Sequence, residues 1–420
     1  MTSPVSSPAT SESTAAPAAS ATATPLSSAR VSVAILALAV GGFAIGTTEF
    51  MTMGVLPQIA DGLDISVPQA GHVISAYALG VVVGVPILSL FVAHLPRKGL
   101  LLTFMGVYAA FNLLSAAAPD YEVLMLARFL DGLPHGAYFG VASLVAASLV
   151  SPERRGRAVA MVMLGLSVAN VLGVPAATWL GQHVGWRVTY AVAAALALAT
   201  VALVMAVVPT SPAAESTGRS EARGFFTNAQ VWLTMVAGAI GFGGLFAVYS
   251  YIGKIVPDVA GLSEGTVPVF VLALGLGMVV GTILAGELAR WSVFKSLLLF
   301  SALSAVIMGV VWVVAPHGWL LLPAVFATTA IGSVVAVNMQ IRLMDVAGDA
   351  VTLGAAMNHA ALNIANALGA WLGGLAIAWG YGYRSTSLVG GGLAVLGVLI
   401  LLWSAAVHRR TAPRAADPGT

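Results

Sequence analysis

The amino-acid sequence predicts an all-α integral membrane protein with 12 transmembrane helices, arranged as two parallel-repeat six-helix bundles. Three observations lead to this prediction. First, 59% of the 420 residues are hydrophobic and only 8% are charged, whereas soluble domains carry roughly 25% charged residues. Second, apolar runs of about 20 residues, the length that crosses a bilayer, recur along the chain. Third, short motifs of the first half return in the second half.

The two ends of the chain are expected to be cytoplasmic tails. Residues 1–29 are mostly Ser, Thr, Ala and Pro, and Glu12 is their only charged residue. A secretory signal would begin with positive charge before a short apolar core, so this segment is interpreted as a disordered tail. Residues 409–420 form the second predicted tail. The chain has no cysteine, which excludes disulfides and thiolate metal sites.

Polar breaks divide the apolar part of the chain into twelve spans. They define an N-terminal six-helix bundle at residues 30–208 and a C-terminal six-helix bundle at residues 229–408. Between the bundles, residues 209–228 are rich in Ser, Ala, Glu and Arg, and we expect a flexible cytoplasmic linker there. The eleven breaks are at residues 61–69, 94–98, 119–122, 151–157, 181–186, 209–228, 253–265, 289–295, 316–318, 342–349 and 380–384.

The basic residues predict the orientation of the spans. With both termini in the cytoplasm, 14 of the 18 basic residues fall on the cytoplasmic side, as the positive-inside rule requires. These residues are Arg30, Arg97, Lys98, Arg154, Arg155, Arg157, Arg219, Arg223, Arg290, Lys295, Arg342, Arg409, Arg410 and Arg414.

Three motifs of the first half recur 196 or 197 residues later. An even number of spans separates each motif from its copy, so the two halves share one orientation, as in parallel repeats. The sequence therefore predicts a two-lobed transporter with its site between the lobes. The copies are Gly80-x-x-x-Gly84 with Gly277-x-x-x-Gly281, Ala169-Asn-x-Leu-Gly173 with Ala365-Asn-x-Leu-Gly369, and Gly185-Trp-Arg-x-Thr189 with Gly382-Tyr-Arg-x-Thr386.

A single acid, Glu49, lies inside the first apolar run. A carboxylate in hydrocarbon is costly, and one that is retained there faces protein, water or a moving ion. Glu49 precedes Pro57 by eight residues, which places it about 12 Å below the outer surface. Arg128 follows Tyr121 by seven residues, so it lies about 10 Å below the same surface. Glu49 is therefore a candidate for proton coupling, with Arg128 at similar depth.

Motifs in three spans resemble those of the major facilitator superfamily, and within it the drug:proton antiporters close to the arabinose efflux permeases. They are Gly46-Thr-Thr-Glu49-Phe-Met-Thr-Met-Gly54-Val-Leu-Pro57, Arg128-Phe-Leu-Asp-Gly-Leu-Pro-His135-Gly136-Ala and Gly165-Leu-Ser-Val-Ala-Asn170-Val-Leu-Gly173-Val-Pro175. The loop after span two departs from the family pattern, because Ala93 stands where the family carries an aspartate. The resemblance implies the major facilitator fold.

The resemblance also implies that spans one and four line a central cavity, so we expect Glu49 to pair with Arg128. Asp131 and His135 follow Arg128 at i+3 and i+7 and share its helix face, which could relay a proton. The proton-coupling candidates are thus Glu49, Arg128, Asp131 and His135. The structural alternatives are a fixed ion pair that cancels two buried charges, Asp131 as the neutralising partner of Arg128, and a helix contact for His135.

Span five carries small residues at a spacing of nearly four, which permits close helix packing. Gly165, Asn170, Gly173 and Pro175 are the predicted packing residues of this antiporter-like motif, with a bend at Pro175. We expect Asn170 to face span eight or the cavity, because exposure of its amide to lipid would be costly.

The second half offers hydrogen-bonding side chains in place of a buried acid. His359, Asn363 and Asn366 recur at i, i+4 and i+7, which is one stripe of a helix. Tyr251 accompanies Tyr249 in span seven. Bridging between helices is the structural alternative for these groups. The candidates for lining the substrate site are Tyr249, Asn338, Gln340, His359, Asn363 and Asn366.

These features predict a secondary active transporter, a proton-coupled exporter of small amphipathic molecules such as drugs or sugars that works by alternating access. Proton-symport uptake of a sugar or other nutrient is the alternative on the same fold. The chain lacks the His-Glu-x-x-His, Gly-x-x-x-x-Gly-Lys and Gly-x-Ser-x-Gly motifs, so no enzyme, catalytic residue, metal site or ATP-driven pump is predicted.

The proton gradient would supply the energy, and no cofactor is expected. The predicted partners are the small-molecule substrate, protons and the lipid bilayer, with no nucleic acid. We expect a multi-pass monomer in the inner membrane of a bacterial cell.

Overall fold

The computed structural model describes residues 27–91, 95–151, 154–210, 219–348 and 350–411. Within these residues every regular element is a helix. The predicted tails lie almost wholly outside the described residues, and so does Ala93, at which the loop after span two departs from the family pattern. The fold prediction can therefore be compared with the helices of both halves.

The first half forms one bundle of helices. Val55 interrupts the first span with φ −112° and ψ 14°, and Pro57 then lies in the first turn of a short second helix, a position that proline tolerates well. The elements are α1 (Ser28–Gly54), α2 (Leu56–Gly62), α3 (Val67–Phe91), α4 (Arg97–Ala117), α5 (Tyr121–Ser148), α6 (Arg155–Val168), the π-helical turn η2 (Ala169–Gly173), α7 (Val174–His183) and α8 (Trp186–Val207).

The second half repeats this order with its own breaks. The elements are α10 (Ala229–Gly241), α11 (Gly243–Tyr249), α12 (Ile252–Lys254), the π-helical turn η3 (Ile255–Val259), η4 (Glu264–Thr266), α13 (Val267–Val314), η5 (Gly318–Leu320), α14 (Leu321–Val346), α15 (Val351–Ala376), the π-helical turn η6 (Ile377–Tyr381) and α16 (Ser385–Thr411).

Ten helical segments among the described residues are long and apolar enough to cross a membrane. One of them, Glu264–Val314, holds two spans, because Ser292 has an extended backbone with φ −174° and ψ 117°. The Ser292 hydroxyl accepts a hydrogen bond from the Lys295 amide at 3.3 Å and caps the next helix. The charged helix α5, of 28 residues, adds the twelfth span. The predicted twelve-span fold is confirmed.

The repeated glycines make the same helix contact in both halves. A side chain at Gly80 or Gly84 of α3 would overlap the carbonyl oxygens of Phe129 and Leu133 on α5. At Gly277 and Gly281 of α13, it would overlap those of Phe326 and Ala330 on α14, and these lie 197 residues after Phe129 and Leu133. Small residues let helix backbones approach this closely. The sequence repeat is therefore a repeat of helix packing.

The Gly-aromatic-Arg motif likewise has one structural role in both halves. Gly185 and Gly382 have φ values of 121° and 73°, which glycine adopts without steric cost. Arg187 then donates to the Ala118 carbonyl at 2.9 Å, and Arg384 donates to the Trp312 carbonyl at 2.6 Å. A cation at a helix carboxyl end is favourable, so each motif caps the third span of its half.

Part of the predicted linker is helical. Helix α9 (Arg219–Thr227) lies within residues 209–228, whereas residues 211–218 are outside the described part of the chain. Phe225 of α9 is buried in the apolar cluster at one end of the bundles. Asn228 then caps α10, since its side chain accepts from the Gln230 amide at 2.9 Å. Burial of an apolar ring explains why this stretch folds despite its charged residues.

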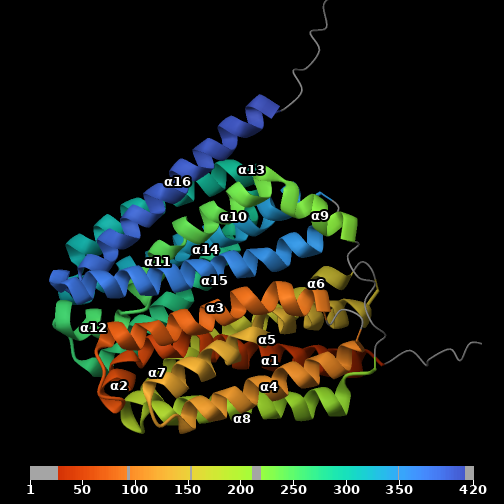
Figure 1. The fold of residues 1–420 in the computed structure, drawn as a ribbon, viewed down its shortest axis with the longest axis horizontal. Helices are drawn as coiled ribbons and strands as arrows, with labels where there is room; N and C mark the ends of the chain where they lie inside the picture. The colour runs from red at the N-terminus through yellow and green to blue at the C-terminus, as the bar shows by residue number, and fades with distance from the viewer. Residues whose placement is uncertain (1–26, 92–94, 152–153, 211–218, 349, 412–420) are drawn as a thin grey trace, which may run out of the picture.

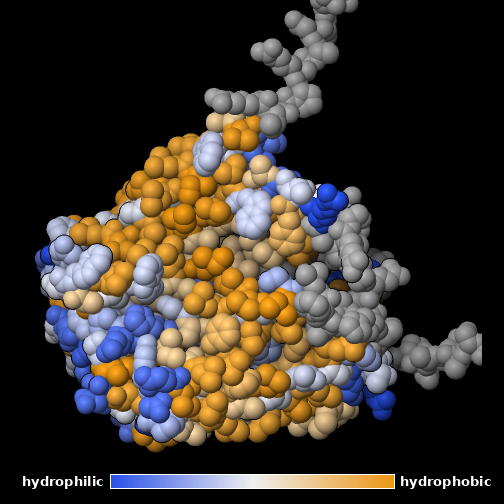
Figure 2. Space-filling view, viewed as in Figure 1, coloured by the Kyte–Doolittle hydropathy of each residue, from blue (hydrophilic) through white to orange (hydrophobic). Residues whose placement is uncertain are grey.

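Figure 1 shows the two bundles one above the other, with α3 and α15 side by side where they meet. Helix α13 also contacts α7 and η2 across this boundary. On the face drawn in Figure 2, hydrophobic residues cover the middle, and hydrophilic residues gather toward the two ends. An apolar girdle of this kind suits contact with lipid tails. The boundary between the bundles positions the site.

Candidate functional site

Helix α5 carries a buried ion pair at the centre of the first bundle. The side chains of Arg128, Asp131 and His135 are 1%, 0% and 2% exposed, and they share one helix face. Arg128 Nη1 donates to Asp131 Oδ2. Asn112 Nδ2 of α4 donates to the other carboxylate oxygen of Asp131 at 2.7 Å. Asp131 thus neutralises Arg128, which is the structural alternative raised from the sequence.

Aromatic rings surround the Arg128 guanidinium. Its central carbon lies 4.2 Å from the Tyr77 ring centroid and 5.2 Å from that of Tyr190, and such contacts stabilise a desolvated cation. Tyr77 Oη shares a hydrogen bond of 2.8 Å with His135 Nδ1, and Tyr190 Oη shares one of 2.9 Å with Thr52 Oγ1. The network therefore joins α1, α3, α5 and α8 around one charge.

Glu49 lies on α1 with 8% of its surface exposed. The expected Glu49–Arg128 ion pair does not form, because Asp131 already occupies the guanidinium from one turn along the same helix. Among the described residues, no basic group lies within ion-pair distance of Glu49, although Arg128 is near enough to interact with it electrostatically. A buried carboxylate without a partner is expensive when ionised, and no ion pair offsets that cost for Glu49 among the described residues.

The residue after Glu49 contacts the second bundle. The Phe50 ring stacks on Tyr249 with centroids 5.6 Å apart and on Phe246 with centroids 6.4 Å apart. Tyr249 is fully buried, and its hydroxyl has no hydrogen-bond partner among the described residues. It lies near enough to Glu49 for electrostatic interaction. The structure thus brings Glu49 and Tyr249, predicted for different roles, to the same place.

The predicted stripe of α15 also lies at the boundary. The His359 ring stacks on Phe139 of α5, with centroids 6.1 Å apart and an interplanar angle of 3°. Asn363 Nδ2 donates to the His359 carbonyl at 3.0 Å, and Asn366 is fully buried. His359 therefore joins the two bundles at the end of the stripe nearer the start of α15.

Tyr251 joins the bundles on the other side of this stripe. Its hydroxyl donates to the Ala370 carbonyl at 2.7 Å, and a side chain at Gly71 of α3 would overlap the Tyr251 hydroxyl. Along α15, Asn366 lies between the residues of the Tyr251 contact and those of the Phe139–His359 contact. The part of the boundary between these two contacts, here called the layer, holds Glu49, Tyr249 and Asn366.

Two predicted substrate residues lie apart from these contacts. Asn338 of α14 is fully buried and donates to the Val334 carbonyl at 2.9 Å. Gln340 is half-buried, and within the part of the chain that the structure describes its side chain makes no hydrogen bond. Among the described residues, neither side chain shares a hydrogen bond with Glu49 or with the stripe of α15.

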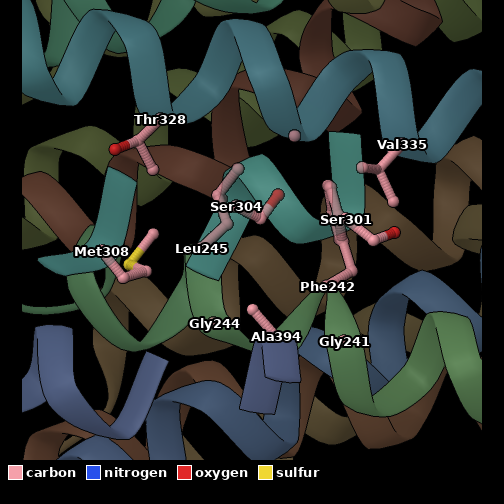
Figure 3. A pocket seen from close by; sticks show the side chains of 11 residues that line it. Gly241, Phe242, Gly244, Leu245, Ser301, Ser304, Met308, Thr328, Val335 and Ala394 are labelled. Atoms are coloured by element: carbon pink, nitrogen blue, oxygen red, sulfur yellow. The ribbon is translucent and has the colours of Figure 1, made fainter. Parts of the chain in front are cut away.

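A small cavity lies inside the second bundle (Figure 3). It has a volume of about 10 Å³, which is room for a single water molecule. Figure 3 shows the hydroxyls of Ser301, Ser304 and Thr328 around it, beside the interruption between α10 and α11 at Phe242. Its size excludes a substrate, and none of the predicted site residues lines it.

The antiporter-like motif packs α6, η2 and α7 against α1. Pro175 has no amide hydrogen for the carbonyl of Val171, and the turn η2 ends two residues earlier, so the proline explains the π-helical geometry. A side chain at Gly165 would overlap the Ala39 carbonyl, and one at Gly173 would overlap Thr47 Oγ1. The backbone of Asn170 contacts Gly275 of α13, in span eight.

We expect Gly173→Leu to impair transport strongly while leaving the amount of membrane-inserted protein within about twofold of the wild type. A leucine remains apolar enough for insertion, but it has no space against Thr47 and Phe43 on α1. Gly140→Leu on α5 is the matched control, because nothing lies within 4 Å of a side chain there. Transport and expression of the two variants would be measured together, and wild-type transport by Gly173→Leu would contradict the packing role.

Sequence reasoning missed the groups that partner the charges. Tyr77, Asn112, Tyr190 and Phe139 were not predicted, since a lone tyrosine, asparagine or phenylalanine in an apolar helix carries no local signal of its contact. Asn112 was the most detectable of them, because an amide in a spanning helix is expected to need a partner.

Comparison with known proteins identifies the group to which the sequence is similar. Residues 38–357 match the Major Facilitator Superfamily. The chain is 38% identical to the inner membrane transport protein YdhP of Escherichia coli (strain K12) over 376 residues. This aligned region covers 90% of this chain and 97% of that protein. It is 31% identical over 336 residues to a chloramphenicol resistance protein of Streptomyces lividans, covering 79% and 86% of the two chains.

A solved structure has the same fold. The crystal structure of a D-xylose-proton symporter superposes with a TM-score of 0.74, covering 89% of this chain and 97% of that chain at 17% sequence identity. At this identity the likeness concerns the fold.

Proposed function

Because this chain belongs to the Major Facilitator Superfamily and is therefore a membrane transporter and not an enzyme, we propose that it exports small amphipathic molecules in exchange for protons. The observation that carries the proposal is Glu49, a buried carboxylate without an ion pair at the boundary of the two bundles. Its neighbour Phe50 contacts the second bundle, so a change in the charge of Glu49 is felt where the bundles meet.

The coupling follows from the cost of burying a charge. When the bundles close around the site, Glu49 is more stable with a bound proton, since the protonated acid needs no ion pair. When the site opens to the cytoplasm, water and a bound substrate reach Glu49, and the proton can leave. Each protonation state then favours one set of conformations, which is the requirement for alternating access driven by a proton gradient.

Export is favoured over uptake by two observations. Span five, made of α6, η2 and α7, carries the antiporter-like glycines and Pro175, and a relative is named a chloramphenicol resistance protein. Uptake by proton symport is the second candidate, because a proton symporter shares this fold. Both candidates use Glu49 and differ in which loaded states change conformation.

Everted membrane vesicles with an acidic interior separate the two candidates. A panel of amphipathic drugs and sugars would be added outside, on the former cytoplasmic face. We expect at least one compound to release the proton gradient in vesicles with the transporter and not in vesicles without it. A transporter that moves substrate only together with protons in the same direction would leave this gradient in place and contradict export.

We further propose a monomer in the bacterial inner membrane with both termini in the cytoplasm. The distribution of 14 of the 18 basic residues supports this orientation, and a relative is named an inner membrane transport protein. Both bundles contribute residues to the site, and these residues meet within one chain.

A further inference from the structure

Asn366 differs from four of the five other buried asparagines of the spans. Asn112, Asn170, Asn338 and Asn363 each donate their side-chain amide to the backbone carbonyl four residues earlier. Asn366 is fully buried, and neither its oxygen nor its nitrogen has a partner among the described residues. The great majority of buried polar groups in proteins are paired, so an unpaired amide needs an explanation.

The position of Asn366 on α15 places it at the boundary between the bundles. Ala365, Gly369 and Gly373 pack against α11 and Tyr251. On another side of the helix, the Ala367 carbonyl accepts a hydrogen bond from Ser75 of α3. At 3.6 residues per turn, Asn366 lies between these two sides, as does Asn363. The amide therefore faces the boundary between the first bundle and α11.

Tyr249 is a second unpaired group in the same layer. A side chain at Gly369 would overlap the Gly243 carbonyl and contact Ala247, and one at Gly373 would contact Ala247 and Tyr251. Tyr249 therefore lies near the level of Gly373, about 10 Å along the helix axis from Asn366. Its hydroxyl is fully buried and unpaired among the described residues, and the stacked rings of Phe50 and Phe246 lie beside it. The layer thus offers two polar groups next to aromatic surface.

We propose that Asn366 and Tyr249 recognise hydroxyl groups of a neutral substrate, with its apolar part against the Phe50 and Phe246 rings. The inference rests on the proposed function and names the chemical class of what is exported. An amide and a phenol each combine a donor and an acceptor, and a hydroxyl group has the same combination. Glu49 disfavours an anion in this layer, and aromatic rings suit an apolar portion.

Phenyl β-D-glucoside and its tetra-O-methyl ether are suitable probes, because they share an aromatic ring and oxygen acceptors and differ in hydroxyl donors. In everted vesicles we expect the glucoside to release the proton gradient, with at least about tenfold lower apparent affinity for the ether. Tetraphenylphosphonium, a cation without hydroxyl groups, is expected to be inactive.

Two variants test the residues. Asn366→Leu and Tyr249→Phe should each weaken the apparent affinity for the glucoside by about tenfold or more, while the melting temperature in detergent stays equal or rises. An amide needed only for folding would instead lower the melting temperature. Thr200→Val in α8 is the matched control, since the Thr200 hydroxyl is buried and bonded to the Leu196 carbonyl of its own helix; its affinity should be unchanged.

The outcomes separate this inference from the function on which it rests. Release of the gradient by tetraphenylphosphonium alone, or equally by the glucoside and its ether, would contradict recognition of hydroxyl groups and leave proton exchange standing. A gradient that none of the three compounds and no member of the wider panel releases would contradict both. Wild-type affinity in Asn366→Leu would remove that residue from the site.

Discussion

Vesicles that contain Glu49→Gln are expected to show no proton-driven accumulation of substrate. Glutamine keeps the size and hydrogen-bonding capacity of the side chain but cannot bind or release a proton. With one proton exchanged per substrate, a gradient of one pH unit supports about tenfold accumulation in the wild type. The variant should bring substrate only to equilibrium across the membrane. Binding of substrate should persist without its dependence on pH.

The controls for Glu49 distinguish titration from charge. Glu49→Asp should retain partial activity, because it keeps an acid one methylene shorter at the same position. Glu287→Gln should transport normally, since Glu287 is exposed and pairs with Arg290 at the surface. Full gradient-driven export by Glu49→Gln would refute the coupling role and move it to Asp131 or His135.

Asp131→Asn is expected to destabilise the folded protein by about 3–5 kcal/mol, the cost of removing one member of a buried ion pair. Arg128 is 1% exposed, and Asp131 is the one acid with which it forms an ion pair among the described residues. The variant would leave a buried cation facing an amide. Less monodisperse protein after extraction and a lower melting temperature in detergent would show the loss.

The double variant Arg128→Met and Asp131→Leu tests whether the stability lost by Asp131→Asn comes from the unpaired charge of Arg128. Replacing a buried pair by apolar residues of similar volume is often neutral for stability, so the double variant should recover much of the melting temperature lost by Asp131→Asn. Unchanged stability of Asp131→Asn would show that the Tyr77 and Tyr190 rings, or water, suffice to hold the guanidinium.

The helices could be predicted from the sequence better than the side-chain partners within the site. Apolar runs and the repeated glycines predicted the twelve spans, because each run must reach across the bilayer and each glycine must admit a neighbouring backbone. Counting residues from the ends of their spans placed Glu49 and Arg128 at a similar depth below the outer surface. Depth does not give the direction in which a side chain extends from its helix, and Asp131, one turn from Arg128, made the shorter connection.

In the second half too, the sequence predicted a helix face but not the residues that contact it. The stripe of His359, Asn363 and Asn366 was visible as a helical period, and the structure places it at the boundary. Its ring contact with Phe139 comes from a helix more than 200 residues earlier, which no local pattern specifies. The helical part of the linker, α9, was missed because one buried ring, Phe225, outweighs its charged neighbours.

The paired glycine contacts determine which parts of the transporter can move. At Gly80, Gly84, Gly277 and Gly281, helix backbones touch without intervening side chains, so α3 cannot slide along α5, or α13 along α14, without driving backbone into carbonyl oxygens. These contacts hold each half as a stiff unit. If the proposed proton exchange moves one half against the other, the contacts that must change are those between the halves, among them Phe50 on Tyr249 and Phe139 on His359, while the membrane-facing shape of each half would stay constant.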